Sequence, residues 1–129
     1  MDLVNKSKYN IILGSGSSRR RELLGMTGIN FSVISIPVDE SFPDSLKGSE
    51  ISEYIVKYKS DSFNKSIEKN EISITADTLV WFENKCLGKP KDKDEAKYML
   101  KLFAGKSHDV ITSVGFLTIN NFKILTEST

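Results

Sequence analysis

From the amino-acid sequence we predict an α/β domain, a sandwich built on a mixed, twisted β-sheet. Short apolar runs typical of strands alternate with segments whose apolar residues recur at helical spacing, which favours helices packed on a sheet. Two closing strands, 109–119 and 122–126, flank a tight Asn120-Asn121 turn and must pair antiparallel. The length of 129 residues suits one core, and no linker or repeat interrupts it. We therefore expect a single domain over residues 1–129.

The first elements alternate between strand and helix. Residues 10–14 are a short apolar run stopped by glycine, which predicts a buried strand. A helix then begins at a serine cap, Ser17 or Ser18, and runs to about Met26. The alternating run 29–36 predicts a second strand, ended by proline and followed by a polar loop.

A second helix is expected from Ser49. Ile51 and Ile55 belong to a stripe of apolar residues with helical period, and Phe63 and Ile67 can extend it. This stripe predicts that one face of the helix packs on the sheet.

The strongest strand prediction is the run 72–82, which is rich in β-branched and aromatic residues. A turn at 83–85 leads back into a short strand at 86–87. Asp92 and Glu95 then form the pattern of a capping box, which predicts a third helix ended by glycine. The residues of this helix that we expect to face the core are Ala96, Met99, Leu100 and Phe103.

Composition excludes several classes of protein. Eighteen basic and seventeen acidic residues leave a net charge of +1, which does not suit a non-specific nucleic-acid binder. Cys86 is the only cysteine, so neither an intrachain disulfide nor a zinc site built on thiolates can form. The N-terminus lacks the apolar core of a signal peptide, and no apolar run approaches the length of a membrane span. We expect a soluble, cytoplasmic protein that binds neither nucleic acid nor membrane.

The stretch ILGSGSSRRRELLG, residues 12–25, predicts an anion site at a strand-to-helix junction. Small residues let backbone N–H groups approach a ligand, and the helix N-terminus favours negative charge. Arg19 and Arg20 can add bidentate donors to phosphate oxygens. The stretch is neither a Walker loop nor a dinucleotide fingerprint. The alternative is a Gly/Ser turn followed by a solvated basic helix face, but basic residues oppose the helix dipole at that end.

Five other polar residues are candidates for chemistry. Asp77 interrupts the apolar strand, so it either pairs or binds a metal, or is an ordinary strand-end aspartate satisfied by its neighbours. Asp39 and Glu40 follow the second strand, where a loop carboxylate can meet a metal, although such pairs are usually just solvated. Lys89 lies in a stiff turn that can aim it at a phosphate, although a solvated lysine is commoner. His108, the only histidine, is expected to make a structural hydrogen bond rather than to act in catalysis.

Four motifs together resemble one family. ILGSGSSRRRELL, VDES, TADTLV and LGKPKDKDEAKYMLKLFAGKSHDVITSVG occur in the order and spacing of the Maf proteins. These are nucleoside triphosphate pyrophosphatases once described as septum-formation inhibitors. The resemblance covers essentially the whole chain.

The resemblance implies an ITPase-like α/β sandwich and a metal-dependent hydrolase that cleaves a nucleoside triphosphate to the monophosphate and pyrophosphate. It implies a divalent metal, Mg²⁺ or Mn²⁺, near Glu40, with Asp77 as general base or metal ligand. The double arginine looks like the branch of the family that acts on dTTP and UTP. The phosphate-binding residues that the resemblance implies are Ser15, Gly16, Ser17, Arg19, Arg20 and Lys89.

The sequence also departs from the family pattern. Ser18 stands where a proline is usual, and aligning the second helix places Ser62 at a family lysine, with Lys59 and Lys65 each about one turn away. The later family motifs, Asp-Lys-Ala-Gly and Gln-Gly, are missing, so the resemblance covers the N-terminal two thirds of the family pattern. The alternative function is a non-catalytic, Maf-derived nucleotide-binding or cell-division regulatory protein.

The last expectation concerns self-association. The sequence stops just after an apparent strand, at Thr129, which would leave unpaired edge groups and uncovered apolar surface. We therefore expect a homodimer in addition to a nucleoside triphosphate substrate.

Overall fold

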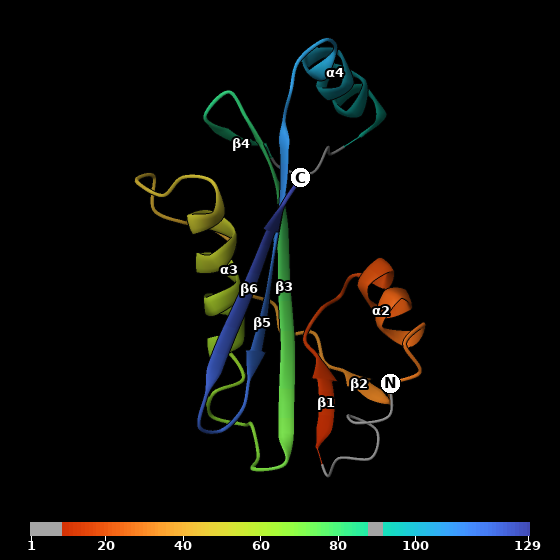
Figure 1. Ribbon diagram of the computed structural model, residues 1–129, viewed down its shortest axis with the longest axis vertical. Helices are drawn as coiled ribbons and strands as arrows, with labels where there is room; N and C mark the ends of the chain where they lie inside the picture. The colour runs from red at the N-terminus through yellow and green to blue at the C-terminus, as the bar shows by residue number, and fades with distance from the viewer. Residues whose placement is uncertain (1–8, 88–91) are drawn as a thin grey trace.

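The computed structural model describes residues 9–87 and 92–129, and its centre is a six-stranded sheet (Figure 1). The strands are β1 (Asn10–Leu13), β2 (Phe31–Val33), β3 (Glu71–Phe82), β4 (Lys85–Leu87), β5 (Asp109–Leu117) and β6 (Phe122–Ser128). They run in the order β2-β1-β3-β5-β6, and β4 pairs with β3. β1 is parallel to both of its neighbours, whereas the remaining pairs are antiparallel. The predicted mixed sheet is confirmed.

The central strand β3 extends well beyond its neighbour β1. β1 ends opposite Ile74, and β4 begins to pair with β3 only at Val80. On the other edge, β5 pairs with β3 from Ser73 to Trp81. The stretch of β3 between the ends of β1 and β4 therefore pairs only with β5 among the described strands, and its other edge is left for side chains of the loops and helices.

Of the three described helices, two begin at predicted side-chain caps, and the third begins at Ser49 as expected, although its N-cap Gly48 makes no side-chain cap hydrogen bond. They are α2 (Ser18–Gly25), α3 (Ser49–Asp61) and α4 (Lys93–Phe103). Of the two serines considered for α2, Ser17 is the cap, and its hydroxyl accepts a hydrogen bond from the Arg20 amide. The Asp92 carboxylate accepts one from the Glu95 amide at 2.8 Å and caps α4.

Helix α3 lies against one face of the sheet and supplies much of the core. Its contacts are mainly with β3 and β5, and Val56 is fully buried against Gly115 of β5. A Cβ at position 115 would lie 2.6 Å from Val56 Cγ1, so the glycine allows the helix to pack this closely. The two apolar clusters below α3 are Ile12, Phe63, Ile67 and Leu117, and Ile51, Ile55, Leu79 and Ile111.

Buried hydroxyl groups join α3 to β5 and β6 between these clusters. The hydroxyls of Ser52 and Ser113 lie 2.7 Å apart, and that of Ser113 lies 2.8 Å from Thr126. Thr126 in turn donates to the Glu53 carboxylate at 2.6 Å. Because each hydroxyl has a partner, this polar seam can be buried without a large loss of free energy.

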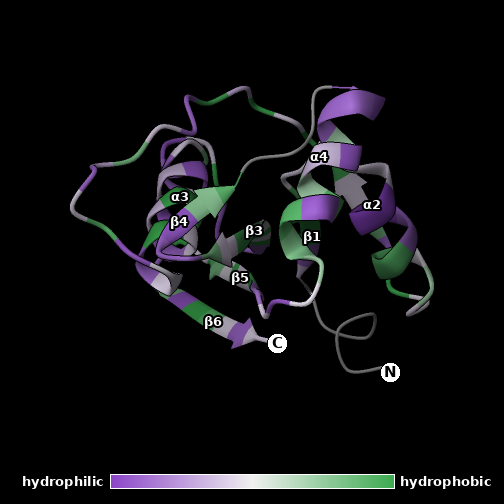
Figure 2. Cartoon of the chain, turned by 90° about the horizontal axis from the view of Figure 1, so that it is seen from above, coloured by the Kyte–Doolittle hydropathy of each residue, from purple (hydrophilic) through white to green (hydrophobic). Residues whose placement is uncertain are grey.

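The other two helices pack more loosely. Figures 1 and 2 show α2 and α3 on opposite sides of β1 and β3, and much of α2 is hydrophilic. The expectation that Leu100 of α4 faces the core is wrong, because its side chain is 70% exposed. The second helix ends at Asp61, yet Phe63 and Ile67 are buried in the turns that follow. In the described ranges, no helix is both long and apolar enough to cross a membrane.

Candidate active site

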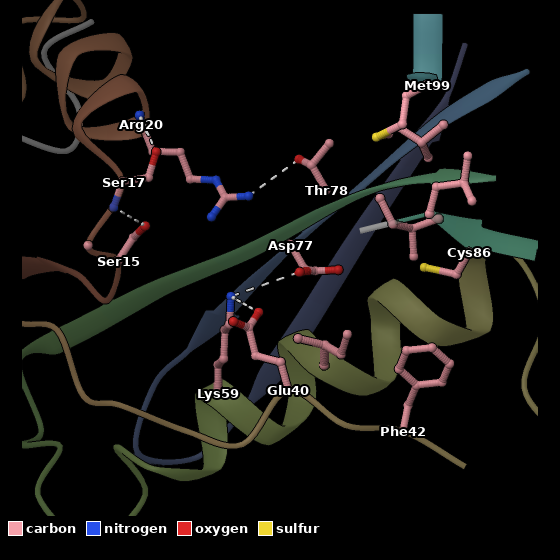
Figure 3. Close-up of a pocket in the computed structure, with 15 residues that line it drawn as sticks. Ser15, Ser17, Arg20, Glu40, Phe42, Lys59, Asp77, Thr78, Cys86 and Met99 are labelled. Carbon is pink, nitrogen blue, oxygen red and sulfur yellow. Dashed lines mark hydrogen bonds and ion pairs between the residues drawn. The ribbon is translucent and has the colours of Figure 1, made fainter. Parts of the chain in front are cut away.

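An open pocket of about 730 Å³ lies beside the stretch of β3 that β1 and β4 leave unpaired (Figure 3). Its walls come from the loop after β1, the start of α2, the segment before α3, α3 itself, β3, β4 and α4. The residues that line it are Ser15, Gly16, Ser17, Arg20, Glu40, Phe42, Ile55, Lys59, Asp77, Thr78, Leu79, Val80, Cys86, Leu87 and Met99.

The loop after β1 forms one wall. Gly14 begins this loop directly after β1. A Cβ at that position would lie 2.6 Å from the Phe63 ring, so only glycine allows the ring to pack this closely against the loop. The Ser17 amide donates to the Ser15 hydroxyl at 3.1 Å, which turns the chain into the N-terminus of α2. Ser15, Gly16 and Ser17 therefore present a narrow loop and a helix N-terminus to the pocket, as an anion site requires.

The two arginines at the start of α2 take different directions. Arg20 lines the pocket, and its guanidinium donates to the hydroxyl of Thr78 on β3 at 3.3 Å. The Thr78 hydroxyl also lies 3.0 Å from that of Thr112 on β5. Arg19 lies outside the pocket lining, where its 69% exposed side chain contacts Glu22 at 3.5 Å. The structure thus brings Arg20, and not Arg19, to the pocket.

Two carboxylates and an ammonium group meet on the opposite wall. Asp77 of β3 is buried, with 8% of its surface exposed. Lys59 of α3 places its Nζ 3.2 Å from Glu40 Oε1 and 3.9 Å from Asp77 Oδ1. The same ammonium donates to the Ala76 carbonyl at 3.1 Å. Figure 3 shows the three side chains pointing toward one another.

Of Ser62 and the two lysines about one turn from it in the sequence, Lys59 is the residue that the structure places beside Asp77. Ser62 is the C-cap of α3, and its hydroxyl donates to the Lys59 carbonyl. Lys59 instead supplies the ammonium group, because it follows Ile51 and Ile55 at four-residue spacing on the face of α3 that packs on the sheet. That spacing is a signal that could have distinguished Lys59 from Lys65 in the sequence.

The far end of the pocket is apolar. Phe42, Leu79, Leu87 and Met99 line it together with the thiol of Cys86. Burial, and to a lesser extent the Asp77 carboxylate, raises the pKa of the Cys86 thiol above its ordinary value. A neutral thiol adds to the apolar character of this end.

The other candidates from the sequence lie elsewhere. Asp39 accepts a hydrogen bond from the Ser41 amide at 3.0 Å, which is a local turn contact. His108 stacks on Phe103 with ring centres 4.4 Å apart, so it packs the base of α4 away from the pocket. Lys89 lies outside the described residues.

Glu40 and Asp77 supply carboxylate oxygens, which are the kind of ligand that Mg²⁺ and Mn²⁺ prefer. No group of three or more His, Cys, Asp or Glu side chains suited to a metal occurs in the part of the chain that the structure describes. A pair of carboxylates fits an ion that is completed by substrate phosphates and water better than one held by protein alone.

A family model described as "Maf-like protein" matches residues 10–128. Over 117 residues the chain is 46% identical to the dTTP/UTP pyrophosphatase of Bacteroides thetaiotaomicron, covering 90% of this chain and 61% of that protein. It is 43% identical over 119 residues to the dTTP/UTP pyrophosphatase of Flavobacterium psychrophilum, covering 92% and 61%. The chain thus spans about three fifths of the length of these curated relatives.

Two solved structures have a similar fold. A nucleoside-triphosphatase / dITP/XTP pyrophosphatase from Mycobacterium abscessus superposes with a TM-score of 0.59 at 11% identity, covering 92% of this chain and 71% of that one. The Ham1 protein of Staphylococcus aureus gives a TM-score of 0.59 at 12% identity, covering 93% and 69%. At this identity the likeness concerns the arrangement of helices and strands alone.

Proposed function

The chain belongs to the Maf-like protein family, and from that premise we propose that it hydrolyses dTTP and UTP to the monophosphate and pyrophosphate. One observation carries the proposal: a single pocket holds a loop and arginine suited to phosphates on one wall and a buried carboxylate on the other. Its volume of about 730 Å³ lies within the usual range for small-molecule sites. The relatives described above are dTTP/UTP pyrophosphatases, which agrees with this substrate class.

The positively and negatively charged groups of the pocket have different roles in this proposal. Backbone N–H groups at Ser15 to Ser17 and the guanidinium of Arg20 bind the phosphate oxygens and stabilise the charge that develops on them. The Asp77 carboxylate orients the attacking water and accepts its proton. Lys59 holds Asp77 in place and adds positive charge beside the phosphates.

The apolar end of the pocket would receive the nucleoside. Phe42 and Met99 offer flat or adaptable apolar surface to a base, and Leu79 continues this surface on β3. This assigns the two ends of the pocket to the two halves of the substrate.

Glu40 and Asp77 would hold Mg²⁺ or Mn²⁺, which supplies neutralisation of the phosphate charge when bound. This role agrees with the oxygen chemistry of the pair. Lys89, which the family resemblance also implies, remains a predicted phosphate-binding residue, whereas Arg19, which the resemblance implies as well, lies outside the pocket lining and pairs with Glu22.

The decisive experiment measures pyrophosphate release from dTTP, UTP, dATP and GTP with Mg²⁺ or Mn²⁺. We expect turnover of the two named pyrimidine triphosphates above the purine ones. Asp77→Asn should keep the fold and nucleotide binding but lower hydrolysis by at least about 100-fold, as for loss of a general base. Near wild-type hydrolysis in this variant, with contaminating phosphatase excluded, would show that Asp77 is structural.

A second candidate function is that of a non-catalytic nucleotide-binding or cell-division regulatory protein. The Ser15–Ser17 loop and Arg20 would suffice to bind a nucleotide without turnover. Tight binding of dTTP or UTP without pyrophosphate release, in the same assays, would favour this function.

The chain also offers a surface for a second copy. β6 is an edge strand, and its Leu125 is 63% exposed beside the half-buried Val114 of β5. A homodimer through this edge would pair the free backbone groups and cover the leucine. The near-neutral net charge of the chain disfavours nucleic acid as a partner. A substrate among the free nucleoside triphosphates would be met in the cytoplasm, which is the location we propose.

A further inference from the structure

The ammonium group of Lys59 is surrounded by oxygen atoms as a bound cation would be. Glu40 Oε1 lies at 3.2 Å, the Ala76 carbonyl at 3.1 Å and Asp77 Oδ1 at 3.9 Å. The side chains of Lys59 and Asp77 are 19% and 11% exposed, whereas that of Glu40 is 57% exposed, so the Asp77 side of the group is shielded from water and the Glu40 side faces it. Lys59 is therefore the cation that these carboxylates hold in the protein alone.

A divalent ion and this ammonium group cannot occupy the same oxygens together. Two positive centres at that separation repel strongly in a partly buried site, where screening by water is weak. One ammonium also neutralises one of the two carboxylate charges and leaves less attraction for a second cation. Free metal must then displace Lys59 before it can reach Glu40 and Asp77.

We propose that Lys59 is a placeholder that keeps free divalent metal out of the Glu40–Asp77 pair until a triphosphate enters the pocket. The inference rests on the proposed function, because it takes these carboxylates as the metal site and a triphosphate as the ligand. Metal and nucleotide then bind cooperatively, since each one helps the other to replace the contacts of Lys59.

The geometry provides the ammonium with a second position. Lys59 lines the main pocket, and the proposed phosphate-binding groups, Arg20 and the Ser15–Ser17 loop, lie on the facing wall (Figure 3). Its four-carbon stem is flexible, so a small rotation can move the ammonium toward incoming phosphate oxygens. New ion pairs with the phosphates then compensate for the ion pairs with Glu40 and Asp77 that Lys59 loses. Metal alone provides no new partner for the ammonium group.

The test measures Mn²⁺ binding by electron paramagnetic resonance, with and without a non-hydrolysable α,β-methylene dTTP. The variant is Lys59→Met, which keeps the length of the stem but removes the charge. Its matched control is Lys57→Met on the same helix, where an exposed lysine pairs with Asp61 at 2.9 Å. We expect wild type and Lys57→Met to bind free Mn²⁺ weakly, and at least about 10-fold more tightly with the analogue.

Lys59→Met should bind free Mn²⁺ at least about 10-fold more tightly than wild type, and the analogue should add less to it. Equal or weaker Mn²⁺ binding by a folded Lys59→Met would overturn the proposal, as would absence of any nucleotide effect in wild type. The wild-type arm needs no variant, and Lys59→Gln replaces Lys59→Met if circular dichroism shows that the latter is unfolded.

Failure of the proposed function gives a different pattern. If the dTTP analogue binds and tightens Mn²⁺ binding in wild type, and Lys59→Met gains affinity for free Mn²⁺, while neither dTTP nor UTP releases pyrophosphate, the placeholder stands and the proposed hydrolysis falls. If Glu40→Gln and Asp77→Asn bind Mn²⁺ as wild type does, the metal site lies elsewhere and the placeholder falls with it.

Discussion

Thr78 connects β3, the strand that carries Asp77, to Arg20 at the start of α2. A guanidinium can only donate, so the Thr78 oxygen accepts from Arg20 and its proton is free to go to the Thr112 oxygen 3.0 Å away. Thr112 on β5 therefore orients Thr78, and through it Arg20, without itself lining the pocket. It is a positioning residue that lies within the last of the four sequence motifs, although the motif does not indicate this role.

Replacing Thr112 by valine keeps its shape and removes this hydrogen bond. We expect KM for the triphosphate to rise about 3- to 10-fold, the effect of losing about 1 kcal/mol, with kcat nearly unchanged. Thr112→Ser retains the hydroxyl and should restore KM. An equal loss in both variants, measured by steady-state kinetics, would mean that the methyl group and packing matter instead.

The two neighbouring arginines should differ in nucleotide affinity. Arg20→Ala removes a guanidinium that faces the pocket and should weaken nucleotide binding about 10- to 100-fold, as for charge-assisted hydrogen bonds. Arg19→Ala removes an exposed side chain paired with Glu22 and should cost much less. Calorimetric titration with the non-hydrolysable analogue measures both, and the reverse order would contradict this geometry.

Residue-level chemistry was predictable only in part. Asp77 is visible in the sequence because it interrupts an apolar strand, and Arg20 because it follows a glycine-rich turn. From the sequence, Lys59 and Lys65 are equivalent candidates, each about one turn from Ser62, and the packing of α3 on the sheet brings Lys59 to Asp77. Ser62 is the C-cap of α3, about one turn beyond Lys59.

At the scale of elements, the approach of α3 to the sheet controls where Lys59 lies. Val56 packs directly on Gly115, so any added atom there must push the helix away from β5. The helix holds Lys59 only one turn further along. Tight packing at Val56 therefore helps to fix the ion pair that Lys59 makes one turn away.

Gly115→Ala should lower the free energy of unfolding by about 1–3 kcal/mol, the usual effect of overpacking a core. The Cβ would also lie 2.9 Å from the Phe122 ring, so there is little room to relax. Gly25→Ala is the control, because nothing lies within 4 Å of its added Cβ at the end of α2. Urea unfolding followed by circular dichroism compares the two, and equal stability would contradict the packing argument.

The sequence pattern predicted the order and type of the helices and strands, but it did not predict which of their side chains are buried. The caps at Ser17 and Asp92 and the strand 72–82 have strong local signals and were predicted correctly. Leu100 belongs to an apolar helical stripe, yet it is exposed because α4 stands at one end of the molecule rather than over the sheet. Periodicity identifies a helix face, whereas tertiary structure decides what covers that face.

At the scale of the whole molecule, α3 covers one face of the sheet, whereas the opposite face is only partly covered. Residues of β5 alternate between buried side chains toward α3 and half-buried ones on the opposite face. Val114 and Phe116 lie on that open face beside Leu125 and Lys123 of the edge strand β6. This combination of edge and apolar surface favours association.

Leu125→Lys should shift the chain toward monomer in light scattering at high protein concentration. It places a charge on the exposed edge, which opposes pairing with a second edge strand. Leu100→Lys is the matched control, because that leucine is 70% exposed on α4 at the other end of the sheet. A wild-type protein that is monomeric throughout would remove the basis for the dimer.

The parallel pairing of β1 with β3 has a consequence for the kinetics of folding. Leu13 and Ile74 lie far apart in the chain, so this pairing must close a long loop, whereas the β5–β6 hairpin forms locally. The phosphate loop follows β1 and Asp77 lies on β3, so the pocket exists only after that slow closure. Nucleotide binding should accordingly recover in the slowest refolding phase, later than most of the strand signal, and partly folded chains should be inert toward triphosphates.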